Sequence, residues 1–240
     1  MRFIDKVRKA FTAGGLLSAR RGLSRALHPQ PVSKFLAHVP PGMMKELHAK
    51  YDGQMKPGQN WLKYTDAPRW LALNIRRAQD IGLDRDRRHL RVLDLGSGGG
   101  YFLFVCRQLG HEGVGLDVPE PTMYGEMFAR FGLRRVVQPV TAQQPLPQEL
   151  LADGPFDLVT AFSIEFNKHA PWGLWTAADW DFLLNDLRDR FVKPDGRVYL
   201  DLNPNYPGDN PYMTPENNEI FRRHGARIDR RSKLTFDPIR

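Results

Sequence analysis

The most informative segment of the chain reads Arg91-Val92-Leu93-Asp94-Leu95-Gly96-Ser97-Gly98-Gly99-Gly100-Tyr101. Residues 92–95 form a short apolar run with a β-branched start, which is typical of a buried parallel strand. Four glycines follow within five positions, where the backbone can turn sharply and a ligand can approach without meeting a Cβ. Apolar residues then recur at helical spacing from 101 to 109. This order predicts a strand, a glycine turn and a helix, the opening unit of a nucleotide-type site at the carboxyl edge of a parallel sheet.

A second strand is predicted at residues 113–117, which are apolar and end in Asp117. Asp117 follows the first glycines at about 20 residues, the spacing at which a carboxylate binds the two hydroxyls of a ribose. The two carboxylate oxygens can accept both hydroxyl protons. Asp117 is therefore a candidate for ribose recognition.

The spacing of the glycines separates two families. The dinucleotide-binding pattern G-x-G-x-x-G would need a glycine at 101, where the chain has Tyr101, so a dehydrogenase is disfavoured. Residues 94–100 instead fit the pattern acid-x-G-x-G-x-G, with Asp94 as the acid and Gly96, Gly98 and Gly100 as the glycines. At this point the chain resembles the class I S-adenosylmethionine-dependent methyltransferases, and the resemblance covers roughly residues 64–236.

The resemblance implies an α/β fold with a Rossmann-like, doubly wound sheet of seven strands, the last one antiparallel, and helices on both faces. The order of patterns agrees, since strand and helix patterns alternate and end in a hairpin. The predicted helices span 43–51, 66–81, 101–109, 122–131, 179–191 and 214–224. The other predicted strands span 133–140, 156–162 and 197–202, with a turn at 193–196 and a hairpin over 226–236.

The resemblance also implies S-adenosylmethionine as cofactor and S-adenosylhomocysteine as product. Lys63 or Tyr64 would reach the methionine carboxylate, and Gln143 would lie beside the adenine. The alternative for Tyr64, together with Trp61, is that both are core aromatics. The full set of expected cofactor-binding residues is Lys63, Tyr64, Asp94, Gly96, Ser97, Gly98, Gly100, Tyr101, Asp117, Val118, Ala142, Gln143, Phe162 and Ser163.

Candidate catalytic residues follow the predicted strand at 156–162, where the resembled family holds its acceptor. They are Glu165, Asn167 and His169. His169 has a side chain suited to base catalysis near neutral pH, and Glu165 could act as the base or orient the histidine. The alternative is that His169 is a surface loop residue. Other polar and aromatic residues expected at this crevice, or else in ordinary packing, are Phe162, Phe166, Trp172, Trp175, Asn203, Asn205 and Tyr206.

Three further interpretations follow from single residues. Asp157 lies at the start of its strand, away from the ligand edge, which indicates a structural role. Cys106 falls in the first helix, so a cysteine nucleophile is disfavoured. Ser163 stands where a metal-dependent transferase would have an acid, so no metal is expected.

Composition sets the broader limits. The chain has 240 residues, is 41% hydrophobic and carries one cysteine, which excludes an intrachain disulfide framework. No segment has the length of a membrane span and no signal peptide is evident, so we expect a cytoplasmic protein. The net charge is +8, and residues 1–30 hold seven basic residues against Asp5 alone.

We therefore expect a basic N-terminal arm, helical segments and linker over residues 1–60, and a methyltransferase domain over 61–240. The arm contains an amphipathic basic pattern, which is typical of an element that binds a membrane surface or another anionic partner, here the inner face of a membrane; a solvated arm or a helix packed on the domain is the alternative.

Three functions remain open at this stage. The first is O-methylation of a small-molecule, glycan-like or lipid-linked acceptor. The second is methylation of RNA with the arm on phosphates, although no RNA-binding module is recognisable. The third is a non-catalytic protein that only binds the cofactor. The oligomeric state is not predicted.

Overall fold

The computed structural model describes residues 22–23, 25–164, 166–168, 173–202, 210–229 and 232–240. Within these ranges no helix combines the length and the apolar character needed to cross a bilayer.

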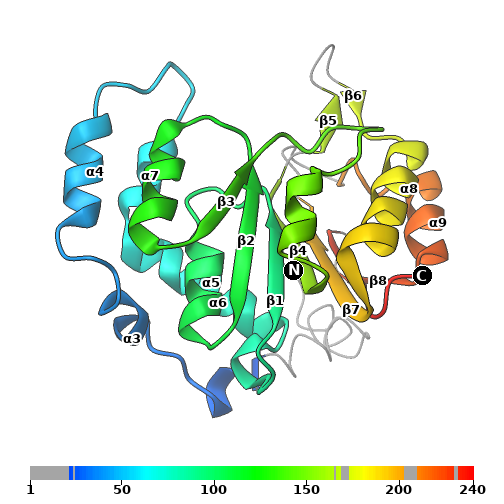
Figure 1. The fold of residues 1–240 in the computed structure, drawn as a ribbon, viewed down its shortest axis with the longest axis horizontal. Coiled ribbons are helices and arrows are strands. Elements are labelled where there is room, and N and C mark those ends of the chain that lie inside the picture. The colour runs from blue at the N-terminus through cyan, green and yellow to red at the C-terminus, as the bar shows by residue number, and fades with distance from the viewer. Residues whose placement is uncertain (1–21, 24, 165, 169–172, 203–209, 230–231) are drawn as a thin grey trace, which may run out of the picture.

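A seven-stranded sheet forms the centre of the protein, with strand order β3-β2-β1-β4-β7-β9-β8 (Figure 1). Its strands are β1 Arg91–Leu95, β2 Glu112–Asp117, β3 Arg134–Val137, β4 Phe156–Phe162, β7 Val192–Asp201, β8 Ala226–Asp229 and β9 Lys233–Phe236. Neighbours from β3 to β7 pair in parallel, whereas β9 runs antiparallel to both β7 and β8. The predicted fold class is confirmed, including the antiparallel last strand.

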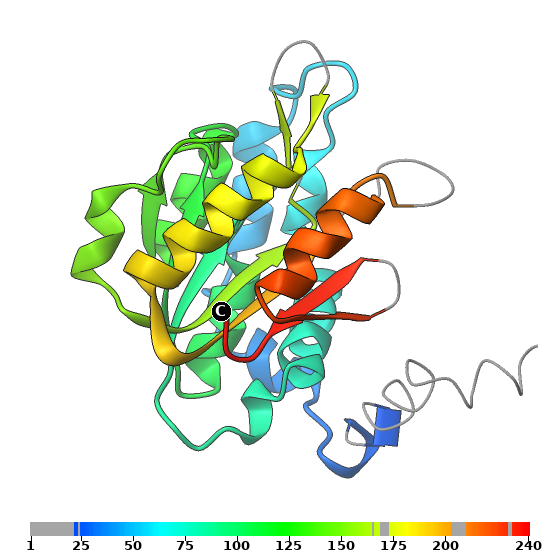
Figure 2. The same ribbon diagram turned by 90° about the vertical axis from the view of Figure 1, so that its right-hand side faces the viewer.

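Helices cover both faces of this sheet (Figures 1 and 2). One face carries α3 Val32–Leu36, α4 Met43–Tyr51, η1 Trp61–Thr65, α5 Ala67–Asp80, α6 Tyr101–Gln108 and α7 Thr122–Phe131. The other carries α8 Ala177–Asp186, the π-helical turn η4 Leu187–Phe191 and α9 Pro215–Arg223. Short 3-10 turns lie at η2 Leu83–Arg85 and η3 Gln148–Ala152, and β5 Asn167–Lys168 pairs with β6 Gly173–Leu174 outside the main sheet.

Two hydrophobic clusters, one on each face, follow from the alternation of strand side chains. On β1, Val92 packs in the cluster with α5 and α6, while Leu93 and Leu95 pack in the cluster with α8. Asp94 points to the same side as Val92, toward α5. The alternation thus places one acid under the first helical layer and leaves its neighbours apolar.

The ends of α5 and α8 follow from local capping. The Asp66 carboxylate accepts the backbone N–H of Arg69 at 3.2 Å, and Pro68 occupies the first turn, as predicted. Thr176 and Asp179 form a capping box, so α8 begins at 177, two residues before the predicted start.

The predicted turn at 193–196 lies inside β7, which begins at Val192 and not at 197 as predicted. Phe156 pairs with Val192 and Leu158 pairs with Arg197, so residues 193–196 all lie opposite Asp157 as an irregularity within β7. The pairing partner on β4 decides this conformation, and the local turn composition does not reveal it. The predicted strand at 133–140 is also shorter, since β3 spans 134–137.

Residues before 61 pack on the same layer as α5. Phe35, Met43 and Leu47 are fully or almost fully buried in the cluster that contains α5 and α6. Arg25 forms an ion pair with Asp80 at the end of α5. The domain boundary at residue 60 stays a prediction, and the amphipathic pattern over residues 1–21 lies outside the described residues.

Candidate functional site

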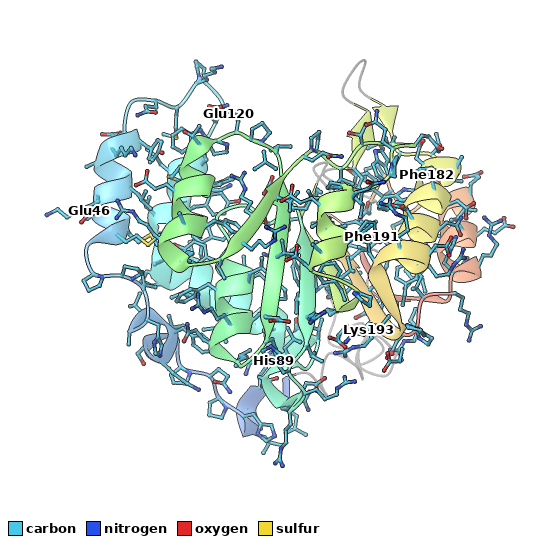
Figure 3. All side chains as sticks on the ribbon, in the orientation of Figure 1. Glu46, His89, Glu120, Phe182, Phe191 and Lys193 are labelled. Atoms are coloured by element: carbon cyan, nitrogen blue, oxygen red, sulfur yellow. The ribbon has the colours of Figure 1, made fainter. Side chains whose placement is uncertain are left out.

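A cavity of about 450 Å³ lies at the carboxyl edge of β1 and β4, under α5. This volume is within the range of small-molecule sites. Figure 3 labels Glu120, in the loop after β2 at this end of the sheet, and His89, before β1 at the opposite end. The lining residues are Lys63, Tyr64, Trp70, Leu73, Asn74, Arg77, Asp94, Gly96, Ser97, Gly98, Gly99, Tyr101, Phe102, Phe162 and Ser163.

The glycine loop forms the floor of this cavity. Gly96, Gly98 and Gly100 have φ values of +66°, +54° and +79°, in the left-handed region that favours glycine. The backbone N–H of Gly96 donates to the carbonyl of Leu116 at 2.8 Å, which ties the loop to β2. A Cβ on Gly98 would meet no atom within 4 Å, so the loop leaves open space for a ligand at this position.

The Asp117 carboxylate is held beside the loop. One oxygen accepts the Gly98 N–H and the other accepts the Val118 N–H, the latter at 2.7 Å. Burial raises the pKa of Asp117, although these two backbone hydrogen bonds oppose the shift. Because a carboxylate oxygen has more than one lone pair, both oxygens can still accept hydrogen bonds from ligand hydroxyls.

The second acid of the site is Asp94, which is 3% exposed. It accepts a hydrogen bond from the Thr160 hydroxyl at 2.6 Å. Burial raises its pKa to about 7, while the Thr160 hydrogen bond and the charge of Arg77 act in the opposite direction. Near neutral pH this acid is therefore poised between its neutral and ionised forms.

Arg77 is a site residue that the sequence analysis missed. Its guanidinium donates to the Ser163 hydroxyl at 3.0 Å and to the Asn74 side chain at 3.2 Å, and it lies 4.6 Å from the centre of the Phe162 ring. Burial lowers the pKa of Arg77. The signal in the sequence was the spacing of Trp70, Asn74 and Arg77, which forms one stripe on a helix.

Ser163 completes this arrangement at the end of β4. Its φ is +61°, a left-handed conformation that is rare for a residue other than glycine. Its backbone N–H donates to the Asp201 carbonyl at 2.9 Å. Backbone strain of this kind clusters at binding sites, and here it brings the serine hydroxyl to Arg77.

Tyr64 lines the cavity and also packs as an aromatic. Its ring stacks on Trp70 with centroids 4.2 Å apart, and its carbonyl accepts the Tyr101 hydroxyl at 2.7 Å. Both interpretations of Tyr64 given by the sequence are thus compatible with its position. Lys63, which precedes it, lies at the cavity with its ammonium 5.5 Å from the Tyr64 ring centre.

Most of the expected cofactor-binding residues come together here. Of the others, Gly100 is the N-cap of α6, and Asp117 accepts the Gly98 N–H but does not line the cavity. Val118 is 38% exposed, and Ala142 packs at the edge of the core. The Gln143 amide donates to Asp179 at 3.0 Å and does not line the cavity. The ligand contacts of all these residues stay predictions.

The expected catalytic residues are not placed. Glu165 and His169 lie outside the described residues, as do Trp172, Asn203, Asn205 and Tyr206. Asn167 belongs to β5, but its side chain is not described. Phe166 and Trp175 are buried against each other, with ring centres 4.9 Å apart, which is ordinary packing.

The structural role of Asp157 is confirmed. Its carboxylate accepts the backbone N–H of Arg91 and the ammonium of Lys193, at 2.8 and 2.7 Å. Burial alone would raise the pKa of Asp157, but these interactions hold it below its usual value.

No protein-family model and no curated protein sequence matches the chain. Solved structures similar to it include PH0226 from Pyrococcus horikoshii (21% identity, 55% of this chain, TM-score 0.42), of which the match spans 57% of the length. A TehB-like SAM-dependent methyltransferase from Corynebacterium glutamicum has 17% identity over 68% of this chain and 92% of its own, with a TM-score of 0.43. A ribosomal protein L11 methylase from Lactobacillus delbrueckii has 21% identity over 75% and 81%, with a TM-score of 0.40. Similarity at this level carries no information about activity, so the functional argument rests on the cavity itself.

Proposed function

We propose that the protein is an S-adenosylmethionine-dependent methyltransferase. One observation carries the proposal: the Gly98 N–H of the acid–glycine loop is bound by the Asp117 carboxylate, beside a cavity of about 450 Å³. This arrangement combines a close-approach loop, a carboxylate of the kind that can bind a diol, and room for a small molecule at the carboxyl edge of a parallel sheet.

The residues present fit the cofactor. Asp117 would accept hydrogen bonds from the two ribose hydroxyls, and the open position at Gly98 would admit the ligand against the loop backbone. Lys63 or Tyr64 would bind the methionine carboxylate. When bound, the cofactor supplies a methyl group attached to a sulfonium sulfur. That sulfur is already a good leaving group.

The protein would contribute mainly placement of the acceptor for in-line transfer. In such a transfer an acceptor oxygen would bond to the methyl carbon as the carbon–sulfur bond breaks, and the electron pair would stay on the sulfur of S-adenosylhomocysteine. The hydroxyl proton leaves to a base, for which His169 and Glu165 are the candidates from the sequence.

We further propose a small-molecule, glycan-like or lipid-linked acceptor that is methylated on oxygen. Support comes from the polar sequence Glu165-Phe166-Asn167-Lys168-His169 after β4. The basic segment of residues 1–30 would hold the enzyme on the inner, anionic face of a membrane, with the protein in the cytoplasm.

Binding of S-adenosylhomocysteine, measured by calorimetry, tests the cofactor site. We expect the wild type to bind and Asp117→Ala to bind about 10–100-fold more weakly, because a hydrogen bond to a charged group contributes about 1.5–3 kcal/mol. The control is Glu112→Ala, at the amino end of the same strand, which should leave the affinity unchanged. A wild type that does not bind, or an Asp117→Ala variant with wild-type affinity, would contradict the proposal.

A further inference from the structure

Three cations of α5 and one of the preceding turn η1 lie at or next to the cavity, and we call them the α5 cation face: Arg69, Arg76 and Arg77 on α5, and Lys63 in η1. Lys63 and Arg77 line the cavity, and so does Leu73, which lies on the helix between Arg69 and Arg76. Residues 69, 73 and 76 share one face because they are separated by about one helical turn each. The cation face therefore runs from the cavity mouth onto the exposed surface of α5.

None of these four cations forms an ion pair with a carboxylate in the part of the chain that the structure describes. Some cations elsewhere on the same helical layer are paired, whereas Lys34, Lys45 and Arg107 have no ion pair among the described residues. Arg130 pairs with Glu46 and Glu126 at 2.6 and 2.9 Å, and Lys50 pairs with Glu126 at 2.5 Å. The α5 cation face is thus a group of cations that are unpaired among the described residues, and it differs from the other cations of this layer in that two of its members line the cavity.

The acids nearest to these cations in the helix are already engaged. Asp66 caps the helix by accepting the backbone N–H of Arg69. Asp80 pairs with Arg25 and lies 4.0 Å from the Lys233 ammonium. Asp94 is buried, with a pKa raised to about 7 by burial, so it neutralises Arg77 only in part at neutral pH.

Aromatic rings hold two of the cations at the mouth. The Lys63 ammonium lies 5.9 Å from the centre of the Trp70 ring, and the Arg69 guanidinium lies 5.8 Å from the same ring. The Trp70 indole N–H donates to the Lys63 carbonyl at 2.7 Å, which fixes the ring between them. Cation–π contacts of this kind orient a cation without neutralising its charge.

The proposed cofactor leaves most of this charge unused, because its methionine part carries a single carboxylate. From the proposed methyl transfer, on which this step rests, we infer that the acceptor carries a phosphate or pyrophosphate group bound by the α5 cation face. Arginine forks match phosphate oxygens in geometry and charge. Arg69 and Arg76 are about 10 Å apart along the helix axis, which suits one or two phosphates better than a long nucleic-acid strand.

Inorganic pyrophosphate is the first probe, titrated by calorimetry at low ionic strength into the full chain saturated with S-adenosylhomocysteine. The test variant is Arg69→Gln/Arg76→Gln. The matched control is Arg87→Gln/Arg222→Gln, which removes two exposed arginines that form no ion pair among the described residues and lie away from the cavity. Neither double variant removes a cavity-lining residue.

We expect pyrophosphate affinity to fall at least tenfold in the test variant and to change less than twofold in the control. Equal affinities in the two double variants, or no binding by the wild type, would overturn the inference. S-adenosylhomocysteine affinity, measured in the same samples, should be equal in all three proteins. If the wild type fails to bind it, the proposed function itself fails, so the two failures are distinguishable.

Methyl transfer identifies the source of the phosphate. Labelled methyl groups are transferred from S-adenosylmethionine into cell extract, and the products are tested for retention on an anion exchanger before and after phosphatase. Label that loses retention supports the inference, with organic-phase partitioning indicating a lipid-linked phosphate and aqueous partitioning a soluble one. Retention that survives phosphatase, or label released by ribonuclease, would overturn it.

Discussion

Gly98 lines the cavity at a position where nothing lies within 4 Å of the place that a Cβ would take. Its φ is +54°, and a side chain at this position would point into empty space. A substitution here therefore tests whether the cavity holds the ligand. Asparagine tolerates this left-handed conformation better than other residues with a side chain. We therefore expect Gly98→Asn to fold normally, to fill part of the cavity and to bind S-adenosylhomocysteine at least tenfold more weakly.

The matched control is Gly53→Asn in the turn after α4. Gly53 has a φ of +78°, and a Cβ there also meets nothing within 4 Å, but the residue does not line the cavity. This variant should keep wild-type affinity in the same calorimetric titration. Equal losses in both variants would mean that the substitution acts through the backbone and not through the cavity.

Asp94 should make the stability of the protein depend on pH. Its pKa in the folded protein is raised to about 7 by burial, whereas an unfolded aspartate titrates near 3.9. The folded state therefore binds the proton more tightly, and the stabilisation from the protonated acid is complete below about pH 4 and lost as pH rises through 7. Asp94→Asn removes this dependence.

The expected result is a free energy of unfolding that falls between pH 5 and pH 8 by about 2–3 kcal/mol more in the wild type than in Asp94→Asn. Chemical denaturation at a series of pH values measures it. A constant difference between the two proteins across this range would show that Asp94 does not carry the shift.

Within β7, the irregularity at 193–196 depends on a glycine. A Cβ on Gly196 would lie 2.6 Å from a Val192 methyl, 2.9 Å from the Lys193 carbonyl and 3.0 Å from the Phe156 carbonyl. Two of these atoms are backbone and cannot move aside cheaply. We expect Gly196→Ala to destabilise the protein by about 1–3 kcal/mol, measured by urea denaturation. Gly154→Ala, whose nearest neighbour would be 3.4 Å away, should cost clearly less; equal costs would contradict the steric argument.

The helices and strands show what the sequence can and cannot predict. The strand at Phe156–Phe162 and the helix at Thr122–Phe131 were predicted to the residue, because apolar periodicity and burial agree there. The strand predicted to begin at 197 begins at Val192, because Val192 pairs with Phe156 of β4 and local composition does not reveal that pairing. Arg77 was missed because an arginine within an amphipathic helix looks like a surface residue until Ser163 and Phe162 are brought to it.

Contacts near the end of α5 place the start of the described chain close to the α5 cation face. Arg25 pairs with Asp80, and the Gln79 side chain donates to the His28 carbonyl at 2.9 Å, so residues 25–28 are anchored at the end of α5. Asp80 is four residues, about one helical turn, from Arg76. The basic arm therefore enters the described structure close to the α5 cation face, and a membrane that binds the arm would lie near that face.

Deletion of residues 1–21 tests this arrangement and leaves the Arg25–Asp80 pair intact. The deleted segment holds Arg2, Lys6, Arg8, Lys9, Arg20 and Arg21 against Asp5. Each basic residue near an anionic surface contributes roughly 1 kcal/mol. We therefore expect the deletion to lower the affinity for phosphatidylserine-containing vesicles at least a hundredfold, as measured by co-sedimentation. Binding to pure phosphatidylcholine vesicles should be weak with or without the segment.

The thermal midpoint and the affinity for S-adenosylhomocysteine should not change, because none of the cavity residues is removed. Vesicle binding that survives the deletion would refute a membrane role for the arm. If it then disappeared on adding Arg69→Gln and Arg76→Gln, the α5 cation face alone would hold the lipid phosphate. Because the two sets of charges are removed independently, their contributions to the free energy of vesicle binding can be separated. If the combined variant loses more binding free energy than the sum of the two single losses, the arm and the helix bind the same surface together.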